Sequence, residues 1–199
     1  MVLQEYNVSV IKPGVLKRDR FGNILDARST VTLIRDEKLN IIVDTGLAEE
    51  RQIILGALSQ YELKPTDINV LINTHSHVDH TGNNDLFKHV HVINSHSEIE
   101  IAPNLKLLET PGHTRDSISV IVRGSIESSG PQNIIITGDA LPIMDNYLKW
   151  VPPGINFDPE IALQSMTKIV ECADIIIPGH DKPFRIIKNQ SHQRRAEYL

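Results

Sequence analysis

Four side chains of the kinds that bind metal ions lie within six consecutive residues: His75, His77, Asp79 and His80. They follow directly after residues 68–72, an apolar run that predicts a short buried strand. Alternate residues of an extended segment point to the same side, so His75 and His77 are expected to face one site. Imidazole and carboxylate groups suit zinc, iron and manganese ions. The segment therefore predicts a metal site at the end of a strand.

Three further candidate ligands lie later in the chain, each in a loop that closes a predicted strand and each directly after a glycine: His113, Asp139 and His180. A glycine allows the backbone to approach a crowded site closely. A single His or Asp in a loop is usually an exposed side chain. The joint pattern is better explained by two metal ions, because one tetrahedral ion takes four ligands and two ions can share a bridging carboxylate.

Segments with strand-like and helix-like patterns alternate along the chain, and the candidate ligands lie in the loops that connect them. Strands are expected at residues 30–34, 40–43, 68–72, 90–93, 105–108, 118–122, 133–137 and 174–177. Helices are expected over 48–61, over 84–89 and from Pro159 onward. A turn-rich stretch is expected over 124–132, a surface loop over 141–158, and a terminal helix or a frayed end over 188–199. The whole predicts one α/β domain over residues 1–199, with two sheet-rich halves and helices outside.

Composition limits the classes of function. The 40% hydrophobic and 23% charged fractions are typical of a soluble globular protein. The formal net charge of −5 argues against a protein that coats nucleic acid, since phosphate binding needs a basic surface. The single cysteine, Cys172, fits a reducing compartment, so a cytoplasmic location is expected. No apolar stretch approaches the ~20 residues of a membrane span, so no membrane partner is expected.

Other polar residues have weaker claims to a role. Cys172 lies on the apolar side of a helix pattern and is expected to be a small core residue. Four histidines lack a comparable context and are expected at the surface or in strands: His89, His91, His96 and His192. Several residues of or near the 141–158 loop are open to two interpretations, contacts to a substrate or ordinary surface anchors: Met144, Tyr147, Lys149, Trp150 and Lys182.

The order of the motifs, His-x-His-x-Asp-His, Thr-Pro-Gly-His, Gly-Asp and Gly-His, resembles the ligand series of the metallo-β-lactamase superfamily. The resemblance extends from about residue 30 to about residue 184. It implies a four-layer αβ/βα sandwich, with two mixed sheets, helices outside and the site at one edge between the sheets. It also implies that Asp44 supports the site from behind the ligands; a simple turn aspartate is the equal alternative.

The same resemblance implies a role for each candidate ligand. The first metal ion is expected to bind His75, His77 and His113. The second is expected to bind Asp79, His80 and His180. Asp139 is expected to bridge the two ions, and Asp79 is also expected to orient the attacking water or to accept its proton. Two divalent ions, zinc first with iron or manganese as alternatives, are the implied cofactors.

This chain differs from several known subfamilies at ligand positions or in length, and these differences limit which subfamily it resembles. Class B1 lactamases have a cysteine where this chain has Asp139, and flavodiiron proteins have a glutamate where it has His77. Typical glyoxalase II enzymes, which are otherwise similar, carry a helical C-terminal domain, and ribonuclease Z and β-CASP nucleases are longer. The stretches 70–87 and 110–122 look most like the small proteins grouped as metallo-β-lactamase domain-containing protein 1.

The expected activity is hydrolysis of a small ester, thioester or lactone by a water activated between two metal ions. One alternative is a metal-dependent phosphodiesterase or ribonuclease, with Lys188, Arg194 and Arg195 as a hint of a basic tail. Another is a mononuclear iron persulfide dioxygenase, and a third is a metal-binding relative without activity. A small-molecule substrate is the expected partner, RNA is the weaker alternative, and the oligomeric state stays open, a homodimer being compatible with the sequence.

Overall fold

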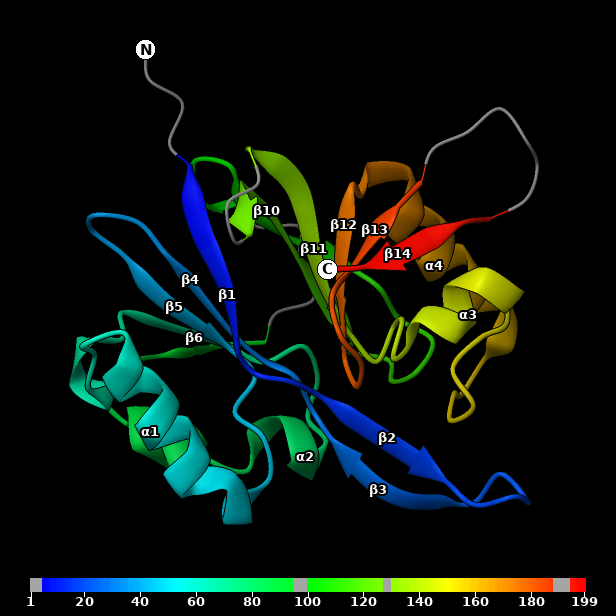
Figure 1. Cartoon of the computed structure of the whole chain (residues 1–199), viewed down its shortest axis with the longest axis horizontal. Coiled ribbons are helices and arrows are strands. Elements are labelled where there is room, and N and C mark those ends of the chain that lie inside the picture. The colour runs from blue at the N-terminus through cyan, green and yellow to red at the C-terminus, as the bar shows by residue number, and fades with distance from the viewer. Residues whose placement is uncertain (1–4, 95–99, 127–129, 188–193) are drawn as a thin grey trace.

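The computed structural model describes residues 5–94, 100–126, 130–187 and 194–199 (Figure 1). Its strands form two groups that stand side by side. The first group contains β1 (Tyr6–Lys12), β4 (Val31–Arg35), β5 (Asn40–Val43), β6 (Val70–Ile72) and β7 (Val92–Ile93). The second contains β8 (Glu100–Ala102), β9 (Leu105–Glu109), β10 (Ile118–Ile126), β11 (Gln132–Gly138), β12 (Ile175–Pro178), β13 (Phe184–Ile186) and β14 (Ala196–Tyr198).

Helices cover the outer face of each group. Ile54 and Leu58 of α1 (Arg51–Gln60) pack with buried residues of β4, β5 and β6. Met166 and Ile169 of α4 (Pro159–Cys172) pack with buried residues of β11, β12 and β13. The remaining helices are short: η1 (Ala48–Glu50), η2 (Pro65–Asp67), α2 (Val78–Thr81), η3 (Asn84–Phe87) and α3 (Met144–Lys149).

The central core lies between the two groups of strands and explains their apolar runs. In β12, Ile175 and Ile177 join the central cluster, whereas Ile176 joins the cluster under α4. Successive residues of a strand face opposite sides, so a strand covered on both faces is apolar at every position. The order of layers is therefore helix, strands, strands, helix. The predicted αβ/βα sandwich is confirmed.

The topology brings four strand ends to one edge. Strands β5 and β6 pair in parallel, and so do β11 and β12, so each pair ends at the same edge. β9 also runs in the direction of β11, because both are antiparallel to β10. The two groups are joined by parallel pairing of β1 with the last residues of β10, Gly124–Ile126. The loops after β6, β9, β11 and β12 are thereby placed around one opening.

A separate hairpin lies beside this opening. Strands β2 (Val15–Arg18) and β3 (Ile24–Arg28) pair only with each other among the described residues, and Figure 1 shows the hairpin extending away from the body. Two apolar side chains at or next to its tip, Phe21 and Leu25, are exposed to solvent. The sequence patterns did not predict this hairpin.

Several expectations need correction. The tail was expected to be a helix or a frayed end, but Ala196–Tyr198 pairs with β13 as strand β14. The 141–158 segment contains α3, and β10 continues to Ile126 where a turn was expected. Cys172 is exposed rather than a core residue, because α4 ends there and Ala173 takes the buried position. Within the described ranges, no helix is long and apolar enough to span a membrane.

Candidate metal centre

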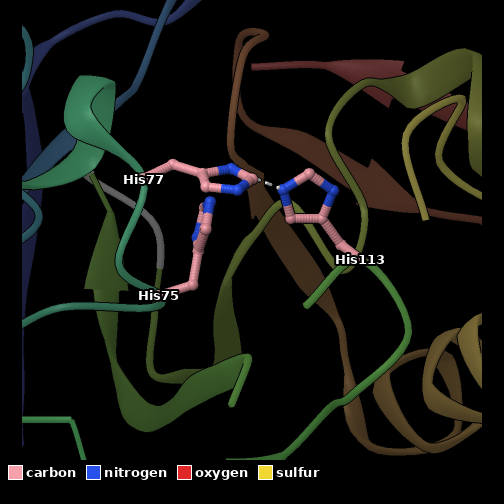
Figure 2. Close-up of side chains that lie close together, drawn as sticks. All are labelled: His75, His77 and His113. Atoms are coloured by element: carbon pink, nitrogen blue, oxygen red, sulfur yellow. Dashed lines mark hydrogen bonds between the residues drawn. The ribbon is translucent and has the colours of Figure 1, made fainter. Parts of the chain in front are cut away.

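The seven predicted ligands converge on one site from loops far apart in the chain. Three sets of donor atoms each lie within 4.8 Å of one another: His75, His77 and His113; His75, His80 and Asp139; Asp79, His80 and His180. Figure 2 shows the first set, with His113 reaching the two histidines of the loop after β6 from the opposite side. His75, His80 and His180 are buried, while Asp79 and Asp139 are partly exposed.

The distances between donor atoms fit shared metal ligation. Two atoms bound to one tetrahedral zinc at about 2.0–2.1 Å are about 3.4 Å apart. His77 Nδ1 lies 3.0 Å from His113 Nε2. His80 Nε2 lies 3.4 Å from Asp139 Oδ1, and His180 Nε2 lies 3.5 Å from Asp79 Oδ2. Each of these pairs is therefore spaced to bind a common ion.

Buried donor atoms without hydrogen-bond partners also indicate metal binding. His75 Nε2, His80 Nε2 and Asp139 Oδ1 are buried and have no hydrogen-bond partner. Burial of such atoms costs free energy unless a ligand satisfies them. Burial, with the nearby His80, lowers the pKa of His75 to about 2, so its imidazole is neutral and offers a lone pair. The donor set therefore fits divalent cations.

Asp139 lies between the two clusters. Its Oδ1 is 3.1 Å from His180 Nε2, and its Oδ2 is 3.5 Å from His113 Nε2. Burial opposes ionisation of this carboxyl, but the neighbouring imidazoles of His180 and His80 hold its pKa well below the usual range. Asp139 is therefore an anion that faces both groups of histidines, as a bridging ligand would.

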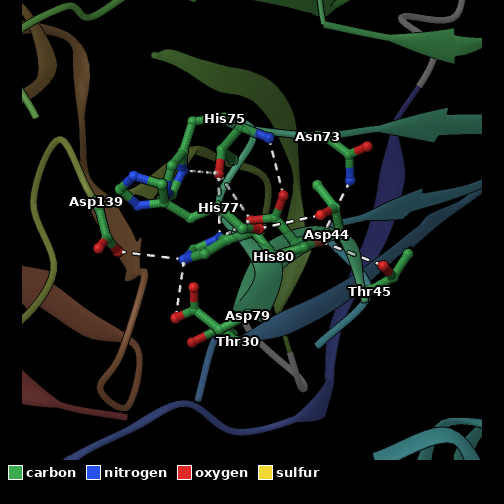
Figure 3. A network of polar contacts seen from close by, with 12 residues as sticks. Thr30, Asp44, Thr45, Asn73, His75, His77, Asp79, His80 and Asp139 are labelled. Carbon is green, nitrogen blue, oxygen red and sulfur yellow. Dashed lines mark hydrogen bonds and ion pairs between the residues drawn. The ribbon is translucent and has the colours of Figure 1, made fainter. Parts of the chain in front are cut away.

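Three imidazoles are oriented by hydrogen bonds on the nitrogen that faces away from the centre. His80 Nδ1 lies 2.8 Å from Asp44 Oδ2 (Figure 3), which leaves Nε2 toward Asp139. His113 Nδ1 donates to the carbonyl of Ile155 at 2.7 Å, and His180 Nδ1 donates to the carbonyl of Arg28 at 2.9 Å. Such partners fix the tautomer and the ring orientation of metal-binding histidines. Sequence reasoning missed the two carbonyls, because any residue type can supply one.

Asp44 is more than a turn aspartate. Its other carboxylate oxygen accepts the backbone N–H of Thr74 at 2.8 Å, so it fixes the start of the 73–80 loop as well as His80. Burial disfavours the charged imidazole, but the carboxylates of Asp44 and Asp139 outweigh it and raise the pKa of His80 to about 10. A cation that binds Nε2 therefore displaces a proton.

Replacing Asp44 by asparagine is expected to weaken metal binding about 10- to 100-fold. Asparagine tolerates the left-handed backbone of this position (φ 61°), but it lacks the negative charge that holds His80. Titration against a chelator measures the effect. Asp85→Asn is the matched control, because Asp85 pairs with Arg51 at the surface. Equal affinities for the two variants would show that Asp44 does not support the centre.

The glycines before the three distal ligands are required by crowding. A Cβ atom added at Gly112 would overlap the backbone of Ala162, one at Gly138 would overlap Thr74, and one at Gly179 would overlap Asp139. Gly112 also has φ 137°, which side chains rarely adopt. The expected close approach at these loops is therefore present.

Gly112→Ala is expected to destabilise the fold by about 2–3 kcal/mol, because α4 has to move away from the His113 loop. Gly56→Ala is the matched control: Gly56 lies within α1 with nothing within 4 Å of an added Cβ. That change is expected to stabilise by about 0.5–1 kcal/mol through helix propensity. The midpoint of thermal denaturation should therefore fall for Gly112→Ala and rise for Gly56→Ala. A shift in the same direction for both variants would contradict this account.

A cavity of about 290 Å³ opens onto the centre. Its walls include His77, Asp79 and Asp139 of the centre. The 141–158 segment, predicted as a surface loop, contributes Pro142 and the stretch 153–155 to the wall of the cavity. The hairpin supplies the facing wall, with Leu16, Arg18, Ile24 and Ala27.

Several other residues that the sequence offered as candidates make contacts away from the centre or lie outside the described residues. Tyr147 is buried, stacks on Phe184 and donates its hydroxyl to the carbonyl of Arg195, away from the centre. Lys149 pairs with Asp145. The guanidinium of Arg194 lies 3.8 Å from the ring centre of Trp150. His96, Lys188 and His192 lie outside the described residues.

Comparison with known proteins agrees with the fold and the motifs. A family model described as the metallo-β-lactamase superfamily matches residues 26–110. A probable metallo-hydrolase of Methanocaldococcus jannaschii is 36% identical over 91% of this chain and 90% of its own length. The metallo-β-lactamase domain-containing protein 1 of Xenopus laevis is 32% identical over 92% of this chain and 83% of its own length.

A third relative is known both as a sequence and as a structure. The N-acyl homoserine lactonase AiiA of Bacillus thuringiensis subsp. kurstaki is 27% identical over 80% of this chain and 84% of its own length. A crystal structure of a B. thuringiensis AiiA variant, with N-decanoyl-L-homoserine bound at the active site, has a TM-score of 0.69 at 23% identity, covering 91% of this chain and 94% of that one. The chain thus belongs to the metallo-β-lactamase superfamily and is one of its metal-dependent hydrolases.

Proposed function

We propose that this chain hydrolyses a small ester, thioester or lactone at a centre of two divalent ions, with zinc as the first choice. The observation that carries the proposal is the convergence of seven donor residues, three of whose donor atoms are buried without a hydrogen-bond partner. One ion would be held by His75, His77 and His113, and the other by Asp79, His80 and His180. Asp139 would bind both, since its carboxylate lies between the two groups: both oxygens are within 3.2 Å of His180 Nε2, and Oδ2 is also 3.5 Å from His113 Nε2.

The protein residues have distinct tasks in this reaction. Ions held at the centre would supply Lewis acidity and activate a water molecule. Asp79 lines the cavity, and its Oδ2 faces His80 and His180. We assign its Oδ1 to hold the proton that the attacking water gives up. Asp44 and the carbonyls of Arg28 and Ile155 keep the imidazoles in place throughout.

The cavity favours a small substrate. Its volume of about 290 Å³ is at the lower end of the ~300–1,000 Å³ usual for ligand pockets. Lactone hydrolysis is also the activity named for the lactonase relative. A reducing location such as the cytoplasm is proposed from the single cysteine of the chain.

Two measurements on one preparation test the proposal: metal content by elemental analysis, and steady-state hydrolysis of an ester, thioester and lactone panel. About two zinc ions per chain with turnover of at least one panel member is the expected result. Full metal loading without any turnover would overturn the substrate class. About one iron per chain, with oxygen uptake on glutathione persulfide, would instead identify a dioxygenase. Metal-dependent cleavage of labelled RNA would identify a nuclease.

A further inference from the structure

Arg18 is the one side chain of fixed positive charge among the described residues that line the cavity. It lies at the end of β2, and its Nη1 donates to the carbonyl of Gly22 across the hairpin turn at 2.8 Å. Its Nη2 faces the other wall, 3.3 Å from the position of a Cβ atom at Gly154. The guanidinium is therefore held between the hairpin and the 153–155 stretch, over the opening to the centre.

The charge of Arg18 has no carboxylate partner in the described parts of the chain. The two acidic residues of the hairpin are engaged elsewhere. Asp26 pairs with Arg28 at 2.9 Å and with Lys17 at 3.9 Å. Asp19 accepts hydrogen bonds from Phe21 and Asn23. A guanidinium offers five N–H groups in a fork that matches a carboxylate, and one of them is used by Gly22.

The walls around Arg18 are apolar. Leu16, Ile24 and Ala27 of the hairpin face the cavity together with Leu47, Val78 and Ile155. A ligand that fills this cavity therefore meets aliphatic side chains, the residues of the centre and a single fixed cation. These features describe a small molecule with an apolar middle and one anionic end.

We propose that Arg18 binds a carboxylate of the substrate, remote from the bond that is hydrolysed, and so selects carboxylated esters, thioesters or lactones over neutral ones. This inference rests on the proposed hydrolytic function of the same centre. Because guanidinium–carboxylate bonds are charge-assisted and bidentate, the carboxylate should strengthen binding about five- to tenfold at this exposed position.

Binding and turnover separate this inference from the proposed function. Calorimetry on the metal-loaded protein compares dicarboxylates from succinate to adipate with monocarboxylates of equal chain length. The expected result is that one dicarboxylate binds about five- to tenfold more tightly than its monocarboxylate. Arg18→Gln should remove that preference and Arg18→Lys should keep part of it. Arg20→Gln should leave it unchanged, because Arg20 stacks on Phe21 and does not line the cavity.

A second experiment measures the hydrolysis of a neutral butyryl ester and of the matching succinyl ester. Arg18→Gln is expected to raise KM for the succinyl ester about five- to tenfold and to leave the butyryl ester unchanged. Equal effects on both esters, or no preference for any dicarboxylate in the wild-type protein, would overturn the role of Arg18. Absence of turnover of either ester, with the dicarboxylate preference intact, would count against the hydrolytic proposal and leave Arg18 as an anion-binding residue.

Discussion

Replacing Asp139 by alanine is expected to lower the metal content from the proposed two ions per chain to one or fewer, and to lower kcat/KM at least about a thousandfold. The reason is its position: one oxygen lies 3.1 Å from His180 Nε2 and the other 3.5 Å from His113 Nε2. Loss of this carboxylate removes an anionic ligand from both groups of histidines at once. Elemental analysis and steady-state kinetics on the same preparation measure both effects.

Asp145→Ala is the matched control for this experiment. Asp145 is an exposed aspartate of α3 that pairs with Lys149 and does not line the cavity, so metal content and rate should stay at wild-type values. Asp139→Asn keeps the shape of the side chain without its charge and should fall between alanine and the wild type. An alanine variant that retains two ions per chain would show that Asp139 does not bridge them.

The candidate ligands could be predicted from the sequence because their spacing reflects the topology. His75, His77, Asp79 and His80 lie in one loop, so local sequence alone predicts their proximity. The three distal ligands could be added because each follows a strand whose end reaches the same edge. Burial on both faces likewise made the continuous apolar runs recognisable as strands.

The residues that line the cavity, and the groups that orient the candidate ligands, could not be predicted from the sequence in this way. The hairpin of β2 and β3 has exposed apolar residues at its tip, and its role depends on where it lies relative to the 153–155 stretch. Carbonyl groups that orient His113 and His180 have no side-chain signature. Tyr147 was a candidate by chemical type, yet it packs on Phe184, a contact made 37 residues along the chain that local patterns cannot encode.

A buried ion pair behind the centre gives the second large effect. Lys12 Nζ lies 2.9 and 2.8 Å from the two carboxylate oxygens of Glu50, and both side chains are nearly inaccessible, 5% and 3% exposed. Glu50→Gln is expected to lower the free energy of unfolding by about 3–5 kcal/mol, because Lys12 is left as a buried, unpaired charge. Urea denaturation near neutral pH measures this loss, which is a large share of the ~5–15 kcal/mol typical of a folded domain.

Two further variants test whether the loss of stability comes from burial of the unpaired charge. Asp85→Asn breaks the exposed Arg51–Asp85 pair, 41% and 48% exposed, and should cost no more than about 1 kcal/mol. The double change Lys12→Met with Glu50→Gln removes the unpaired charge and should recover much of the loss. Glu50 also lies 3.5 Å from Arg28, whose carbonyl holds His180, so the single variant should bind metal more weakly as well. If Glu50→Gln costs no more than Asp85→Asn, Lys12 reaches water in the folded protein and the pair does not anchor this side of the centre.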